Sequence, residues 1–157
     1  MKKLIAATLL VFSYICQASA QDFAIREVFK QMPDSLMPYL TKNNRLDFID
    51  FLDSGMRAEV KNSLDGTSEM LSLGSDSLTI RLSQSLKVDI LTPDTIIVMI
   101  ETFMVDSVYG ESRVKYFSRD WHPLDRQPEL NPAVMQRIRR LELQNIVKRD
   151  DDLLNKR

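Results

Sequence analysis

The stretch SLTIRLSQSLKVDILTPDTIIVMIETFM, residues 77–104, decides the fold class because its first half places an apolar residue at every second position. This alternation is typical of strands in an antiparallel sheet, which have one face on the core and one in water. Two short polar clusters, Ser83–Ser85 and Thr92–Asp94, interrupt the pattern. Such brief connections favour hairpins, because a parallel crossover needs a dozen or more residues. The stretch therefore predicts a meander of antiparallel strands.

The same pattern adds strands on both sides of this stretch. Residues 71–73 read LSL, so both leucines are expected to point into the core. Residues 96–100 are apolar at every position, which is typical of a central strand covered on both faces. Val114 and Tyr116 are expected to point inward from a final strand that ends near Trp121. We therefore expect an antiparallel meander sheet of about five strands.

Two helices are predicted before the sheet. The first has apolar residues at the i, i+3, i+4 and i+7 positions of one helix face, namely Ile25, Val28, Phe29 and Met32. Pro33 is expected to stop it, because the residue before a proline is disfavoured in the helical region.

The second predicted helix begins near Asn44, a residue type favoured at the N-cap, and ends near Gly55. Its buried stripe is expected to contain Leu46, Ile49, Leu52 and Met56. Residues 57–64 fit either a strand or the frayed end of this helix.

A long helix is predicted after the sheet. Asn131 is a good N-cap and Pro132 fits the first helical position, where its missing N–H does no harm. Val134, Ile138 and Leu141 are expected to form the buried face of this helix. The fold class is therefore α+β: two N-terminal helices, a meander sheet and one long C-terminal helix, with the helices segregated against the sheet.

Residues 1–20 have the three parts of a secretory signal peptide. Lys2 and Lys3 provide the positive charge, residues 4–15 are almost entirely apolar, and residues 18–20 read ASA, the small residues before a cleavage site. We expect cleavage before Gln21, a single domain over residues 21–157 and a disordered tail over residues 150–157.

Two other interpretations of this leader fit less well. A membrane anchor needs about 20 apolar residues, more than this run provides, so no transmembrane segment is expected after cleavage. Acylation of Cys16 would need a leucine three residues earlier and a small residue just before it, and the sequence has Ser13 and Ile15 there. The leader therefore predicts a periplasmic or secreted protein.

Composition excludes several functional classes for the 137 residues that remain after cleavage. Cys16 is the only cysteine, so the mature chain has no disulfide and no thiolate metal site. Removal of Lys2 and Lys3 leaves 19 basic and 22 acidic residues, which argues against nucleic-acid binding. We expect no cofactor and no metal site.

The candidate functional residues lie near the end of the last predicted strand. His122 is the only histidine, so a hydrolase would have to use it as the general base, with Asp120 nearby. No G-x-S-x-G nucleophile motif accompanies it. Tyr109, Trp121 and His122 are a second candidate set, as the lining of a binding groove. A surface histidine and a core tryptophan are the simpler interpretation of the same residues.

Two charged patterns are less specific. Asp106, Glu111 and Asp120 could supply the carboxylate pair of a glycosidase, but no spacing selects a pair among so many acidic residues. The cations between Arg137 and Arg149 could contact anionic lipid or polysaccharide, and the following acidic run would weaken that attraction. A solvated helix face is the simpler interpretation of these cations.

Several stretches resemble the DUF3256 family, small secreted proteins of unknown function from Bacteroides-type bacteria. They are FKQMPDSLMPYL (29–40), NNRLDFIDFLDSGM (43–56), residues 68–90 and VKYFSRDWHPL (114–124). The resemblance covers most of the mature chain and implies an envelope or extracellular protein of a diderm gut-type bacterium. It carries no catalytic motif.

Three functional hypotheses follow. The first is an exported, non-catalytic protein that binds an envelope protein, a glycan or a lipid component. The second is a periplasmic hydrolase that uses His122 with a nearby carboxylate. The third is a carrier of a small apolar ligand, which requires a cavity of a few hundred Å³.

Overall fold

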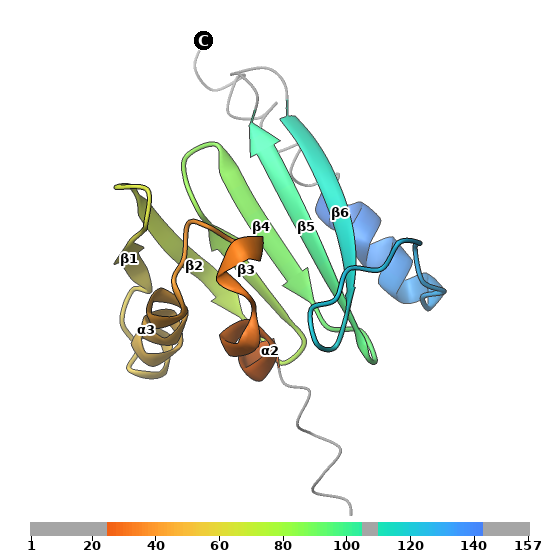
Figure 1. Cartoon of the computed structure of the whole chain (residues 1–157), viewed down its shortest axis with the longest axis horizontal. Coiled ribbons are helices and arrows are strands. Elements are labelled where there is room, and N and C mark those ends of the chain that lie inside the picture. The colour runs from red at the N-terminus through yellow and green to blue at the C-terminus, as the bar shows by residue number, and fades with distance from the viewer. Residues whose placement is uncertain (1–24, 105–109, 143–157) are drawn as a thin grey trace, which may run out of the picture.

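One six-stranded antiparallel sheet forms the centre of the protein (Figure 1).

The computed structural model describes residues 25–104 and 110–142. The signal peptide, Tyr109 and the C-terminal tail therefore lie outside the described residues. The elements in chain order are α2 (Ile25–Gln31), the 3-10 helix η2 (Asp34–Leu36), α3 (Lys42–Asp53), β1 (Glu59–Lys61), β2 (Thr67–Leu73), β3 (Ser77–Arg81), β4 (Leu86–Leu91), β5 (Ile96–Met104) and β6 (Gly110–Ser118). Residues 132–142 form the last helix.

The strands follow each other in chain order, β1-β2-β3-β4-β5-β6, and every neighbouring pair is antiparallel. The predicted meander is therefore confirmed, with six strands in place of about five. The additional strand is β1, which resolves the ambiguity over residues 57–64. Its three residues gave too short an alternation to recognise, because only Val60 among them is buried.

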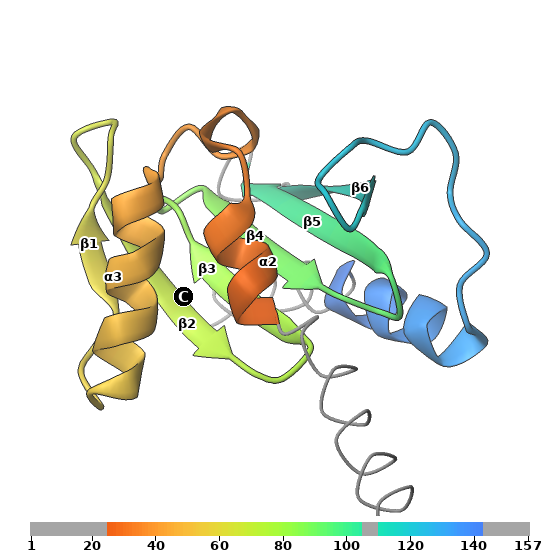
Figure 2. The same cartoon turned by 60° about the horizontal axis from the view of Figure 1, so that its bottom comes forward.

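Helices cover both faces of the sheet (Figures 1 and 2). On one face α2 and α3 pack against a core that includes Ile97 and Met99. On the other face the helix over 132–142 packs against Val98 and Ile100. The expectation that residues 96–100 are covered on both sides is confirmed. The helices are therefore not segregated on one face, because the continuous apolar run of β5 has two faces to bury.

A β-bulge shifts the register of β2. Met70 pairs with Ile80 and Ser72 pairs with Thr79, so one additional residue, Leu71, lies on β2 between the two pairs. The bulge directs Leu71 outward, where it is 46% exposed. The prediction that Leu71 points into the core was therefore wrong, since simple alternation cannot show an inserted residue.

The first helix matches its prediction. Ile25, Val28, Phe29 and Met32 are all buried, and α2 ends at Gln31, two residues before Pro33.

The limits of the second helix differ from the prediction. Its N-cap is Thr41, whose hydroxyl accepts a hydrogen bond from the Asn44 backbone N–H. Asn44 is the third helical residue, and its side chain completes a capping box by accepting from the Thr41 N–H. The helix ends at Asp53, and Gly55 adopts a φ of 69° that turns the chain away. Met56 therefore lies beyond the helix and is 52% exposed, not buried.

The last helix begins as predicted. The Asn131 side chain accepts a hydrogen bond from the Ala133 N–H at 2.9 Å, which is N-cap geometry. Ile138 is buried, and Val134 and Leu141 pack beside it against the sheet. No helix within residues 25–104 and 110–142 is long and apolar enough to cross a membrane.

Candidate binding site on the sheet

The face of the sheet that carries the last helix is polar over β1–β3 and apolar over β4–β6. The apolar cluster under the last helix draws on β4, β5 and β6. Over β1, β2 and β3 the same face carries charged side chains, because Glu59 pairs with Glu69 and Glu69 pairs with Arg81 across the ladder. Directly paired residues point to the same face of a sheet, so these three side chains form one row on this face.

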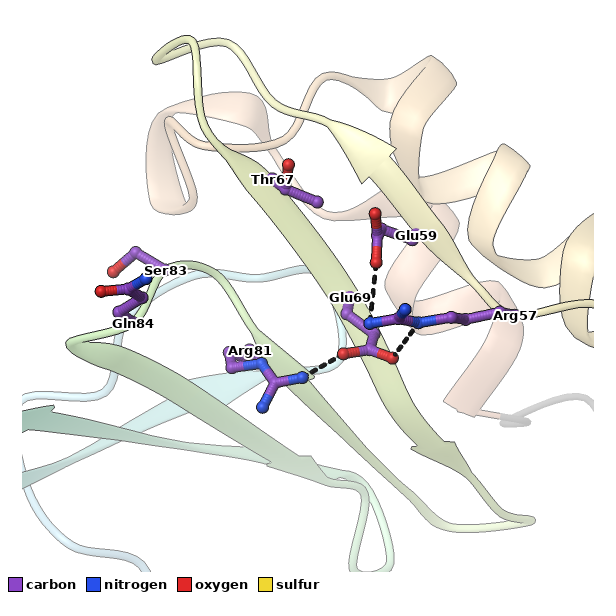
Figure 3. Close-up of a pocket in the computed structure, with 7 residues that line it drawn as sticks. All are labelled: Arg57, Glu59, Thr67, Glu69, Arg81, Ser83 and Gln84. Carbon is purple, nitrogen blue, oxygen red and sulfur yellow. Dashed lines mark hydrogen bonds and ion pairs between the residues drawn. The ribbon is translucent and has the colours of Figure 1, made fainter.

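Glu69 is the centre of an ion-pair cluster (Figure 3). One carboxylate oxygen accepts a hydrogen bond from Nε of Arg57 at 2.8 Å, and the other accepts from Nη2 of Arg81. Arg57 also reaches Glu59, with Nη2 2.8 Å from Oε2. The Glu69 side chain is only 17% exposed, whereas both arginines are largely open to solvent. The cluster therefore presents fixed guanidinium groups over a shielded carboxylate.

These residues line an open concavity of about 510 Å³. We call its lining the polar face, which consists of Arg57, Glu59, Thr67, Glu69, Arg81, Ser83 and Gln84. No side chain of the set is aliphatic or aromatic, so the surface offers hydrogen bonds and charge to a ligand. Planar guanidinium groups match the geometry of carboxylates, and hydroxyl and amide groups add further donors and acceptors.

The ion pairs hold both partners in their charged forms. The hydrogen bond from Arg57 lowers the pKa of Glu69, with Arg81 adding to the effect and partial burial opposing it. The same hydrogen bond raises the pKa of Arg57, assisted by the charges of Glu59 and Glu69. At neutral pH the carboxylate is therefore occupied by two cations and is not available as a general base.

The cluster predicts a contribution to acid stability. A depressed pKa in the folded state means that Glu69 stabilises the protein above its unfolded pKa of about 4.3, and that this contribution disappears as pH falls through the lower folded value. In urea unfolding at pH 7 to 3, Glu69→Gln should therefore be less stable than wild type at pH 7 and approach it at pH 3. The double variant Arg57→Gln/Arg81→Gln should show the same convergence. A Glu69→Gln deficit that stays constant with pH would contradict this account.

Arg137 shows how one cation of the last helix is used. Its Nη2 donates to Asp76 at 3.2 Å and to Ser77 at 2.6 Å, which ties the helix to the start of β3. The hydrogen bond from Arg137 lowers the pKa of Asp76. Arg139 and Arg140 are exposed on the outer side of the same helix.

Trp121, which the sequence suggested for a binding groove, belongs to the core. It is 5% exposed, its indole Nε1 donates to the Val28 carbonyl at 2.9 Å, and its ring lies 5.4 Å from that of Phe117. Its φ of 62° turns the side chain inward after a tight turn closed by the Ser118 carbonyl.

Asp120 and His122 flank Trp121 and are both exposed. A second open concavity of about 500 Å³ lies nearby, between β6 and the following loop. Its lining includes Tyr116, Pro123 and Leu124, and neither Asp120 nor His122 contributes to it.

Sequence reasoning did not select the polar face. Its only signal was the alternating polar positions of residues 67–81, which also describe any solvated strand. Arg57 and Glu59 belong to residues 57–64, for which the sequence did not distinguish a strand from the frayed end of a helix. Their meeting with Glu69 and Arg81 depends on strand register, which the sequence did not specify.

Comparisons with known proteins agree with this fold. Residues 15–150 match the family described as "Protein of unknown function (DUF3256)". The structure is similar to that of a domain of an uncharacterized protein from Porphyromonas gingivalis W83, with a TM-score of 0.55 and 22% sequence identity. The similarity covers 66% of this chain and 57% of that chain, so this chain aligns with little more than half of its neighbour. No curated protein matches the sequence. The resemblance seen in the sequence is confirmed, and the chain belongs to the DUF3256 family.

Proposed function

We propose that this protein is an exported, non-catalytic binding protein of the cell envelope, and that the polar face holds a polar partner, a protein segment or a glycan. The observation that carries the proposal is the open concavity of about 510 Å³ around the Arg57–Glu69–Arg81 cluster. Its setting on three paired strands gives the donors a fixed geometry before any partner arrives, which reduces the entropy lost on binding.

The chemistry of the polar face supports binding in preference to catalysis. Arg57 and Arg81 each engage Glu69 through one N–H and remain solvent-exposed, so further guanidinium donors face outward. Such donors suit a partner carboxylate or sugar hydroxyls. An apolar ligand is a poorer fit, because it would bury these charges without hydrogen bonds.

The leader supports export. Its charged start, apolar run and small residues before Gln21 match the requirements of a secretory signal. The absence of cysteine after residue 16 means that the mature domain tolerates either redox compartment.

Site-specific photo-crosslinking in the source bacterium tests the proposal. A photoreactive amino acid at Thr67 or at Gln84 should give a discrete adduct in the envelope fraction. The same group at Asn43, exposed on α3 across the sheet, should give none. Mass spectrometry of the crosslinked protein should show a chain that begins at Gln21. Adducts of equal yield from all three positions would contradict the assigned face, and an intact Met1 on a cytoplasmic protein would contradict export.

A further inference from the structure

The last strand of the sheet leaves part of its outer edge open. Near its end, the chain returns along this edge: the Ser118 N–H donates to the His122 carbonyl at 2.8 Å, and the Leu124 N–H donates to the Tyr116 carbonyl at 2.9 Å. Tyr116 and Ser118 therefore direct their backbone groups away from β5. Because this direction alternates along a strand, Gly110, Ser112 and Val114 direct theirs outward too.

The outward groups of Gly110, Ser112 and Val114 have no backbone partner in the part of the chain that the structure describes. The hydrogen bond from Leu124 to Tyr116 marks one end of the open edge. The open edge of β6 therefore consists of five residues, Gly110–Val114. A row of unpaired N–H and C=O groups at a sheet edge is a template for another strand.

The charges beside this edge are complementary to themselves. Glu111 and Arg113 lie on the same face of β6, on either side of Ser112, and both are exposed. If a second copy of β6 runs antiparallel with Ser112 opposite Ser112, each Glu111 stands opposite Arg113 of the second copy. Opposite charges at directly facing positions stabilise a strand pair.

Other registers fit less well. A two-fold axis at Glu111 or at Arg113 would place that residue directly opposite its own counterpart, a pair of like charges. An axis at Val114 would place Arg113 against Lys115 of the second copy, a pair of like charges. Lys115 is already bound to Glu101, with Nζ 2.7 Å from Oε1. Ser112 is thus the centre that satisfies both the backbone and the charges.

We propose that a second copy of this chain docks on the β6 edge, antiparallel and with Ser112 on the two-fold axis, to give one continuous sheet. In this arrangement Ser112 exchanges two backbone hydrogen bonds with its counterpart, and Gly110 exchanges two with Val114 of the second copy. The polar face over β1–β3 stays open in both copies, so the proposal is independent of the assigned binding function.

Charge reversal tests this arrangement by analytical ultracentrifugation of the purified protein. The wild type should form a dimer that weakens with added salt. Glu111→Arg and Arg113→Glu should each weaken it by about tenfold or more, because two attractive pairs become repulsive. An equimolar mixture of these two variants should recover association. The first variant is positive at both positions and the second is negative at both, so every facing pair between unlike copies is attractive.

Amide hydrogen exchange of the unmodified protein provides a second measurement. The N–H groups of Ser112 and Val114 should exchange more slowly as protein concentration rises, while that of Glu111, bonded within the sheet, should not change. A wild type that stays monomeric at millimolar concentration would overturn the proposal. The proposal would also be overturned if the single variants dimerised as strongly as the wild type, or if their equimolar mixture did not associate. Binding of an unrelated peptide at the β6 edge without dimerisation would overturn it as well.

Discussion

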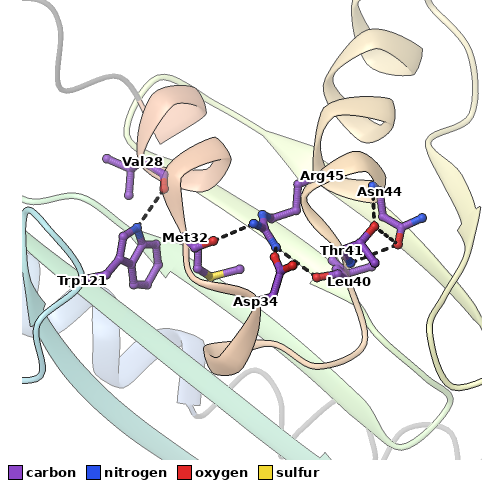
Figure 4. Close-up of polar contacts among 8 residues, drawn as sticks. All are labelled: Val28, Met32, Asp34, Leu40, Thr41, Asn44, Arg45 and Trp121. Carbon is purple, nitrogen blue, oxygen red and sulfur yellow. Dashed lines mark hydrogen bonds and ion pairs between the residues drawn. The ribbon is translucent and has the colours of Figure 1, made fainter.

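Replacing Arg45 with alanine is expected to lower the free energy of unfolding by about 3–5 kcal/mol, because a large buried side chain and the donors to two carbonyls are lost. Arg45 belongs to α3, is 1% exposed, and its side chain extends toward the end of α2 (Figure 4). Its guanidinium donates to the Met32 carbonyl at 2.6 Å and to the Leu40 carbonyl at 3.0 Å, and it reaches Asp34 at 2.8 Å. Alanine would leave two buried carbonyls without donors and an unfilled volume. Urea denaturation followed by circular dichroism measures the change.

Two further variants separate the causes. Arg45→Met keeps most of the volume and removes the donors, so its loss measures the unsatisfied carbonyls. Asp34→Asn removes only the charge of an exposed partner and should cost less than about 1 kcal/mol. An Arg45→Ala loss no larger than that of Asp34→Asn would show that Arg45 does not join the two helices.

Replacing Trp121 with alanine is expected to cost about 3–5 kcal/mol, as for other large aromatic residues in a core. The indole ring packs on Phe117 and its N–H satisfies the Val28 carbonyl, so it joins the end of the sheet to α2 (Figure 4). Trp121→Phe keeps the ring contact and loses the hydrogen bond, and should cost about 1–3 kcal/mol through the unsatisfied carbonyl.

The neighbouring residue supplies the control for Trp121. His122→Ala replaces an exposed side chain in the same turn and should change stability by no more than about 0.5 kcal/mol. If His122→Ala proved as destabilising as Trp121→Ala, the turn itself would be the sensitive feature, and the assignment of Trp121 to the core would be wrong.

Periodic segments made most of the fold predictable. The two-residue alternation of residues 77–91 and the wholly apolar run of 96–100 identified β3, β4 and β5. The four apolar positions of α2 and the Asn131-Pro132 start of the last helix were equally direct. Each of these signals is local, because the period of a regular element is written in its own residues.

The error at Leu71 and the burial of Arg45, for which the sequence analysis made no prediction, have a different cause: both depend on a contact outside their own element. Leu71 points outward because of a bulge that is defined by pairing with β3. Arg45 takes a buried position on α3 because α2 ends nearby, leaving the Met32 carbonyl without a helical partner. From the sequence alone, an arginine in a helix is expected to lie in solvent, because the distant carbonyl that accepts its hydrogen bond is not known.

The sequence did not predict the candidate site, because its residues come together only through strand pairing. Glu69 and Arg81 are twelve residues apart and become neighbours only through the β2–β3 register. Trp121 and His122 were selected because tryptophan and histidine are rare in this chain. The left-handed backbone conformation of Trp121 turns its side chain into the core, whereas the His122 side chain stays in solvent. Selecting residues by rarity of type therefore identified a turn with a structural role, not a binding site.

The most direct test of the proposed binding face is the yield of the Thr67 photo-adduct when one arginine is reversed. Arg81→Glu places a negative charge beside Glu69, whereas Arg26→Glu makes the same change beside Asp53, on the helices across the sheet. If the polar face holds the partner, Arg81→Glu should reduce the adduct at least about tenfold and Arg26→Glu should leave it unchanged, with both proteins folded by circular dichroism. Equal yields from the two variants would contradict the proposed site.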